Sequence, residues 1–137
     1  MMVKQIFVNL PVADLKASIA FFTRLGFSFN PNFTDDTGTC MIVGENIFAM
    51  LMMRERFAGF APHPPADARS ATEVILALQL DSRDAVDAMV REAVAAGGNI
   101  YNAPQDHGSM YQHGFQDPDG HVWEVFQMNP AHGDEPI

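Results

Sequence analysis

The chain has 137 residues, of which 47% are hydrophobic and 18% charged, and its formal net charge is −9. This composition excludes a disordered chain and can fill one ordinary core or two small modules. Its eight Lys and Arg residues are scattered, which argues against nucleic acid or an anionic membrane surface as a partner. Cys40 is the single cysteine, and no stretch reaches the roughly 20 apolar residues of a membrane span. A cytoplasmic protein is therefore expected.

The first half of the sequence predicts the element order βαβββ followed by a linker. Pro11 is expected to end the first strand, Asp14 to cap a helix, and Gly26 to end that helix in a left-handed conformation. Between Asp14 and Gly26 the apolar residues follow helical spacing. Residues 54–70 are rich in Pro and Ala and predict a linker, with one helical turn over 54–60. The predicted strands are residues 5–10, 27–33, 39–43 and 47–53.

The same order of elements begins again in the second half of the sequence. Asp81 or Ser82 caps a second predicted helix, which the pair Gly97 and Gly98 ends. Residues 117–120 read Asp-Pro-Asp-Gly and predict a turn, with Pro at its second position and Gly where a positive φ is needed. The predicted strands are residues 73–80, 99–101, 110–116 and 122–128. Residues 106–108 are expected to form a loop and residues 130–137 a loose tail.

The repetition of one supersecondary unit decides the predicted fold class. Two βαβββ modules predict an α+β protein rather than a continuous parallel sheet. The first module is predicted over residues 1–53, the linker over 54–70 and the second module over 71–129.

Three segments of the chain resemble the vicinal oxygen chelate superfamily, which includes glyoxalase I, extradiol dioxygenases and the bleomycin- and fosfomycin-resistance proteins. The most specific segment is residues 115–125, in which Glu124 stands four residues after the glycine of the turn. The others are residues 7–27 and 77–98. The resemblance covers residues 4–129 and looks like a branch labelled predicted lactoylglutathione lyases. It implies curled mixed sheets that build a cup, and a homodimer in which modules pair within one chain or between two.

The resemblance also implies a divalent metal, with ligands on the first and last strands of each module. It places those ligand positions at Phe7, Met50, Ile75 and Glu124, and only Glu124 keeps a ligand type. A lone carboxylate is a poor metal site, because divalent ions need several ligands in fixed geometry. No cofactor is therefore expected in the usual place, and a divalent metal at another place remains the alternative.

Strand alternation predicts which side chains point into the cup. Counting back from the predicted turn places Gly114 opposite Glu124 and Gln112 opposite Phe126. The resulting pocket is apolar with a few polar groups, which is typical of a small-molecule site. Its predicted members are Phe7, Asn9, Phe48, Met50, Met52, Ile75, Gln79, Gln112 and Glu124.

Glu124 is the candidate catalytic residue, as a general acid or base in apolar surroundings. The alternative is that its carboxylate hydrogen-bonds Asn9 or Gln79 and only holds the cup together. His113 is predicted on the opposite face of its strand. A bulge at Gly114 would bring His113 beside Glu124, as an acid–base partner or a second metal ligand.

Two functions follow from these residues and from the resemblance. The first is a metal-free protein that binds a small, largely apolar organic molecule, as bleomycin-resistance proteins do. The second is a metal-dependent lyase, isomerase or dioxygenase, similar to lactoylglutathione lyase, that uses Glu124. The sequence leaves open whether the protein is an enzyme.

Overall fold

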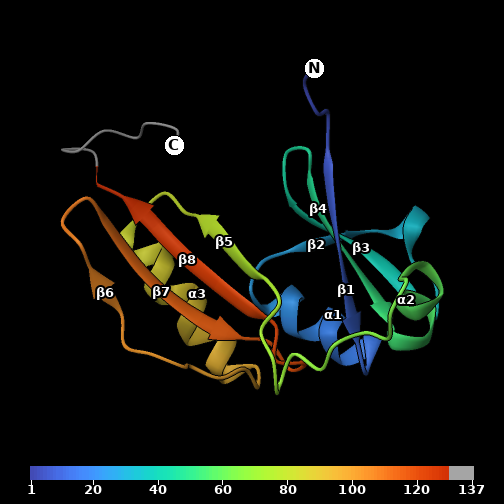
Figure 1. Cartoon of the computed structure of the whole chain (residues 1–137). Helices are drawn as coiled ribbons and strands as arrows, with labels where there is room; N and C mark the ends of the chain where they lie inside the picture. Colours follow the sequence, from blue (N-terminus) through green and yellow to red (C-terminus); the bar gives the residue numbers. More distant parts are fainter. Residues whose placement is uncertain (130–137) are drawn as a thin grey trace. The chain divides into compact units, whose positions relative to one another are not determined.

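The computed structural model describes residues 1–129, and the predicted tail at 130–137 lies outside the described residues. The chain divides into two compact units, the first ending at Ala66 and the second beginning at Asp67. Each unit holds one mixed four-stranded sheet with a helix of ten or more residues against one face (Figure 1). The predicted α+β fold with two βαβββ modules is confirmed. Within residues 1–129, no helix is long and apolar enough to cross a lipid bilayer.

The sheet of the first unit has the strand order β1-β4-β3-β2, in which β1 and β4 run parallel. Its strands are β1 (Ile6–Val12), β2 (Ser28–Asn30), β3 (Gly38–Gly44) and β4 (Ile47–Met53). Pro11 does not end β1 as predicted, because β1 lies at the sheet edge, where a residue without an N–H is tolerated. The predicted extended segment 27–33 is also shorter than expected, since a 3-10 turn occupies Pro31–Phe33.

Helix α1 (Leu15–Arg24) begins and ends at the predicted residues. The Asp14 carboxylate accepts a hydrogen bond from the Ala17 backbone N–H at 3.1 Å, and Gly26 has a φ of +102°. The apolar side of α1 packs on one face of the sheet, where alternate strand residues point. The core of this unit comprises Leu10, Val12, Leu15, Phe21, Phe22, Met41, Ala49 and Leu51.

A second helix in the first unit, α2 (Arg54–Phe60), occupies the beginning of the segment predicted as a linker. The Arg54 guanidinium donates hydrogen bonds to the carbonyl oxygens of Pro65 at 3.0 Å and Ala66 at 3.4 Å. These bonds tie the end of the first unit back to the start of α2.

The sheet of the second unit has the strand order β5-β8-β7-β6, with β5 and β8 parallel. Its elements are β5 (Ile75–Gln79), α3 (Arg83–Ala95), β6 (Gln105–Asp106), β7 (Met110–Gln116) and β8 (Val122–Met128). Ser82 is the cap of α3, since its hydroxyl accepts from the Ala85 N–H at 3.0 Å. The core between α3 and the sheet comprises Val86, Val90, Ala93, Tyr111, Phe115, Trp123 and Val125.

The second strand of the second unit lies later in the chain than predicted. Asn99 makes only an isolated bridge to Gln116, and the strand forms at β6, where a loop was expected. Gln105 pairs with Gln112 and Asp106 with Tyr111. A strand of two residues is too short to show alternation, so its position depends on contacts made elsewhere in the unit.

The predicted turn at residues 117–120 is confirmed and is built around one buried carboxylate. Asp117 is 3% exposed and accepts hydrogen bonds from the backbone N–H groups of Asp119 and His121 and from the Trp123 indole, each at 3.0 Å. Burial raises the pKa of Asp117, while His121 and the indole N–H oppose that rise. Gly120 has a φ of +90° and closes the turn.

We expect Asp117→Ala to lower the free energy of unfolding by about 3 kcal/mol, because it leaves three N–H donors without their acceptor in a buried place. Urea denaturation measures the change. Asp36→Ala, in an exposed turn, is the control and should change the free energy by less than about 0.5 kcal/mol. Equal stability of the two variants would contradict this account of the turn.

Candidate functional site

Each sheet has an open face, which we define as the face away from α1 or α3. In the first unit, Phe7 pairs with Phe48 and Asn9 with Met50, so these residues and Met52 share the open face, as alternation predicts. The rings of Phe7 and Phe48 stack with centroids 4.8 Å apart and planes 14° from parallel. Phe48 lies on β4, between β1 and β3, and on β3 it pairs with Ile42. Three apolar side chains, Phe7, Phe48 and Ile42, therefore adjoin on this face and are called the aromatic patch below.

The open face of the second sheet carries the other predicted residues. Gly114 lies opposite Glu124 and Gln112 opposite Phe126, as counting back from the turn predicts. Ile75 and Gln79 share this face on β5, because Ala77 between them pairs with Glu124.

The two sheets repeat the same register, which identifies equivalent positions. Phe7 lies opposite the residue two before Met50, and Ile75 lies opposite the residue two before Glu124. Phe7 therefore corresponds to Ile75, and Met50 to Glu124. Of these four side chains only Glu124 offers an oxygen ligand.

This set of side chains does not fit a divalent metal. Hard and borderline cations prefer oxygen and nitrogen ligands. The apolar side chains of Phe7 and Ile75 and the thioether of Met50 supply none, so the Glu124 carboxylate is the single ligand of this set. No group of three or more His, Cys, Asp or Glu in the described part of the chain is placed to hold a metal ion. We therefore derive no chemical step through a metal.

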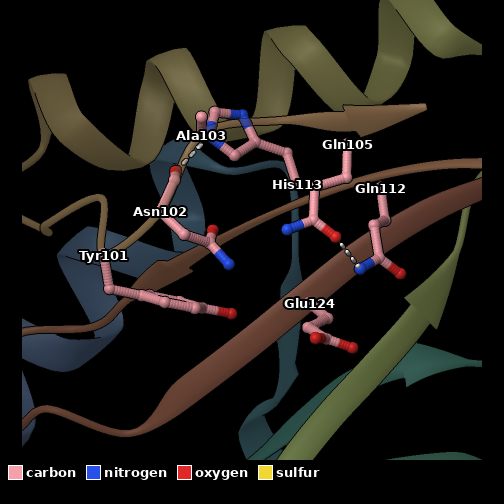
Figure 2. A pocket seen from close by; sticks show the side chains of 7 residues that line it. All are labelled: Tyr101, Asn102, Ala103, Gln105, Gln112, His113 and Glu124. Atoms are coloured by element: carbon pink, nitrogen blue, oxygen red, sulfur yellow. Dashed lines mark hydrogen bonds between the residues drawn. The ribbon is translucent and has the colours of Figure 1, made fainter.

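A pocket forms in the second unit where the chain leaves the edge of the sheet. Between the Asn99–Gln116 bridge and the Gln105–Gln112 pair, residues 100–104 run beside β7 without pairing to it. The five residues 100–104 span the same distance as the three residues 113–115 of β7. The longer segment therefore arches away from the strand. The pocket under this arch is lined by Tyr101, Asn102, Ala103, Gln105, Gln112, His113 and Glu124 (Figure 2).

Tyr101 lies over Gly114 and points toward Glu124 (Figure 2). A Cβ atom on Gly114 would overlap the Tyr101 hydroxyl and lie 2.9 Å from its Cζ, so only glycine leaves room for the ring. Burial raises the pKa of the Tyr101 hydroxyl, and the charge of Glu124 raises it further. The phenol therefore keeps its proton at neutral pH and can donate a hydrogen bond.

The remaining polar side chains of the pocket bond mainly to one another. Gln112 Nε2 donates to Gln105 Oε1 at 3.3 Å, and His113 Nε2 lies 3.1 Å from the Asn102 carbonyl oxygen. The half-buried carboxylate of Glu124 has no hydrogen bond or ion pair with any residue of its own unit among the described ones. Asn9 in the first unit donates to the Phe7 carbonyl oxygen at 3.2 Å.

The alternative of a bulge at Gly114 is not realised, and His113 lies on the opposite face of its strand from Glu124, as predicted. β7 pairs with β8 in unbroken register, and His113 lies opposite Val125 on the face toward α3. The irregularity is in residues 100–104 instead, so His113 reaches only the rim of the pocket. Tyr101 was not among the predicted site residues. A glycine inside a strand often marks the close approach of another group, and Gly114 was the available signal for it.

Arg56 is a second residue that the sequence did not single out. Its Nη1 donates to Asp35 Oδ1 at 3.3 Å and to the Thr37 hydroxyl at 3.0 Å. It also lies 2.8 Å from where a Cβ of Gly38 would stand. Gly38 pairs with Met52, so a guanidinium lies at this end of the open face of the first sheet.

The pocket rim at β6 is attached to α3 by charged groups. Arg83 Nη1 lies 2.8 Å from Asp106 Oδ2, and the Arg83 guanidinium stands 4.0 Å from the centre of the Tyr111 ring. The Tyr111 hydroxyl donates to Asp87 on α3. The Gly108 backbone N–H and then Arg83 lower the pKa of Asp106. These contacts position a strand that its own sequence does not specify.

Comparison with known proteins identifies relatives of this fold. A sequence model of the Glyoxalase/Bleomycin resistance protein/Dioxygenase superfamily matches residues 4–125. A search of curated proteins finds no significant match. The solved structure of hypothetical protein SA1046 from S. aureus is 26% identical, with a TM-score of 0.79, covering 93% of this chain and 95% of that one.

Two further structures share the fold at lower identity. TnmS3, an antibiotic binding protein from Streptomyces sp. CB03234, is 21% identical with a TM-score of 0.65, covering 93% of this chain and 98% of that one. A bleomycin resistance determinant encoded on transposon Tn5 is 23% identical with a TM-score of 0.62, covering 93% of this chain and 99% of that one.

We expect Asp106→Asn to lower the melting temperature at pH 7, with the loss shrinking as the pH falls. Because the folded-state pKa of Asp106 lies below its unfolded value, the carboxylate stabilises the fold above the unfolded pKa. That contribution disappears as the pH drops through the folded value. Thermal melts between pH 3 and 7 measure the difference, with Glu45→Gln in an exposed turn as control. A loss that stays constant with pH would contradict the role of the charge.

Proposed function

Because the chain belongs to the Glyoxalase/Bleomycin resistance protein/Dioxygenase superfamily, we propose that it binds a small, largely apolar organic molecule without the divalent metal of many members. The observation that carries this proposal is the presence of Phe7, Met50 and Ile75 at three of the four positions where the family places metal ligands. The antibiotic-binding and bleomycin-resistance proteins with the same fold support a binding role.

The aromatic patch is the surface best suited to an apolar ligand. Phe7 is 47% exposed and Ile42 36% exposed, although both lie on strands of the sheet rather than in a loop. Fully covering an aromatic or aliphatic side chain of this size contributes about 1.5–3 kcal/mol. The nearly parallel rings of Phe7 and Phe48 offer a flat surface that suits a planar group.

A second copy of the chain is the other group that could cover these open faces. We propose that the protein is a homodimer, on the grounds of its family and of the exposed apolar side chains on its sheets. The free thiol of the lone Cys40 supports the cytoplasmic location that the sequence predicts.

An enzymatic function is the second candidate, and the pocket of the second unit favours it. There a carboxylate without a partner in its own unit adjoins a phenol that keeps its proton. Such a pair can accept a proton at one group and donate one at the other, as a lyase or isomerase requires. In this enzymatic alternative Glu124 is the base. The reaction then needs no metal ion at the four positions where the family places metal ligands.

We expect purified protein to hold less than one metal ion in every ten chains, measured by elemental analysis after gel filtration in buffer without chelator. Planar aromatic compounds should raise its melting temperature, since a ligand at ten times its Kd adds about 1.4 kcal/mol of stability. Zn²⁺, Ni²⁺ and Mn²⁺ should leave the melting temperature unchanged. One ion per chain, or a rise with metals alone, would overturn the proposal.

The variant Phe7→Ala should reduce the thermal shift caused by such an aromatic ligand by at least half, because it removes one of the two stacked rings. Phe33→Ala is the matched control, since Phe33 is 65% exposed and lies in the 3-10 turn away from the sheet. If both variants respond to the ligand as the unchanged protein does, the aromatic patch is not the binding surface.

A further inference from the structure

Residues 100–104, called the arched segment below, are attached to β7 at both ends and unpaired between them. At the first end, Asn99 and Gln116 exchange two backbone hydrogen bonds of 3.0 and 2.7 Å. At the second end, Gln105 of β6 pairs with Gln112 of β7. All residues of the arched segment are exposed. A segment with few buried contacts and few backbone hydrogen bonds opens locally at a low free energy.

Gly114 has two backbone groups that point toward the arched segment and find no partner there. The Asp117 N–H donates to the His121 carbonyl oxygen at 3.1 Å just after β7. Because hydrogen-bonded pairs alternate along an antiparallel ladder, His113 and Phe115 bond to β8, and Gly114 between them points away from it. In the described part of the chain, neither the N–H nor the carbonyl oxygen of Gly114 has a hydrogen bond, although the residue is buried.

Tyr101 is the side chain that closes the arched segment over these groups. It lies over Gly114 and points toward Glu124 (Figure 2). The hollow beneath it leaves no room for a water molecule that could bond to the Gly114 backbone. The closed position therefore buries part of an aromatic ring, but it leaves two backbone groups unpaired and removes water from the half-buried Glu124 carboxylate. Because these contributions oppose each other, we expect an open position of the segment to be populated.

We propose that the arched segment is a flap that opens and closes over the open face of the second sheet. Its hinges are Asn99 and Gln105, on either side of the part that does not pair with β7. Tyr101 is its latch over Gly114. Opening exposes the Glu124 carboxylate and lets the two unpaired backbone groups bond to water or to a ligand. The flap thereby controls access to this part of the open face under either function proposed above.

Native-state hydrogen exchange of the full chain, labelled with ¹⁵N and without ligand, tests the flap through the Gly114 amide. We expect this amide to exchange roughly 10- to 1,000-fold more slowly than an unprotected one, since minor conformations are about 0.1–10% populated. The amides of His113 and Phe115 are internal controls and should exchange far more slowly, because they require β7 to separate from β8. Low urea should speed their exchange and leave that of Gly114 unchanged, because flap opening exposes little surface.

Two variants of Tyr101 test the latch. Tyr101→Ala removes the ring and should speed the exchange of the Gly114 amide at least about tenfold, because the burial of the ring is lost. Tyr101→Phe is the matched control, since it keeps the ring and should change the rate less than about threefold. Tyr101 is 40% exposed, so both variants should fold. Unchanged exchange of His113 and Phe115 in each variant checks that the sheet is intact.

Three results would overturn the flap. Exchange of Gly114 as slow as that of His113 and Phe115 would show that the arched segment does not open by itself. Exchange as fast as that of an unprotected amide would show that the segment is not closed. Equal rates in Tyr101→Ala and in the unchanged protein would show that the ring is no latch. Because no ligand is present, none of these results depends on the function proposed above.

Discussion

The register between the first and last strand of each unit is the constraint on which the rest of the structure depends. It is fixed by parallel pairing from Ile6 with Ile47 onward in the first sheet and from Ile75 with Val122 onward in the second. A slip by one residue would turn every side chain of a strand to the other face. The slip would bury Phe7 against α1 and expose Leu10, so the apolar cores hold the register in place. The composition of both open faces follows from it.

From this register it follows that one carboxylate, Glu124, stands among residues that cannot help it bind a divalent ion. The same unit then adds Tyr101, which lies over Gly114 because Gly114 has no side chain, and which points toward Glu124 (Figure 2). The chemistry available on the second sheet is therefore that of a charged acceptor beside a phenol. On the first sheet it is that of stacked rings with a guanidinium at the far end.

Regular elements could be predicted from the sequence, and irregular ones could not. Strands β4, β7 and β8 have the predicted bounds, because alternation or a continuous apolar run marks them and strong turns delimit them. The pairing of Gly114 with Glu124 followed from the turn alone. The position of β6 and the placement of Tyr101 did not, since residues 99–106 show no period. They depend on bonds from Arg83 and on space beside Gly114. Membership of the predicted superfamily is confirmed by the match over residues 4–125.

Electron paramagnetic resonance of free Mn²⁺ tests the central claim most directly, because a bound ion loses its sharp six-line signal. Titration of Mn²⁺ with the full chain should leave that signal undiminished at equimolar protein, since Phe, Met and Ile occupy the places of three ligands. A loss of the signal that saturates at one ion per chain, and that Glu124→Gln abolishes, would contradict it.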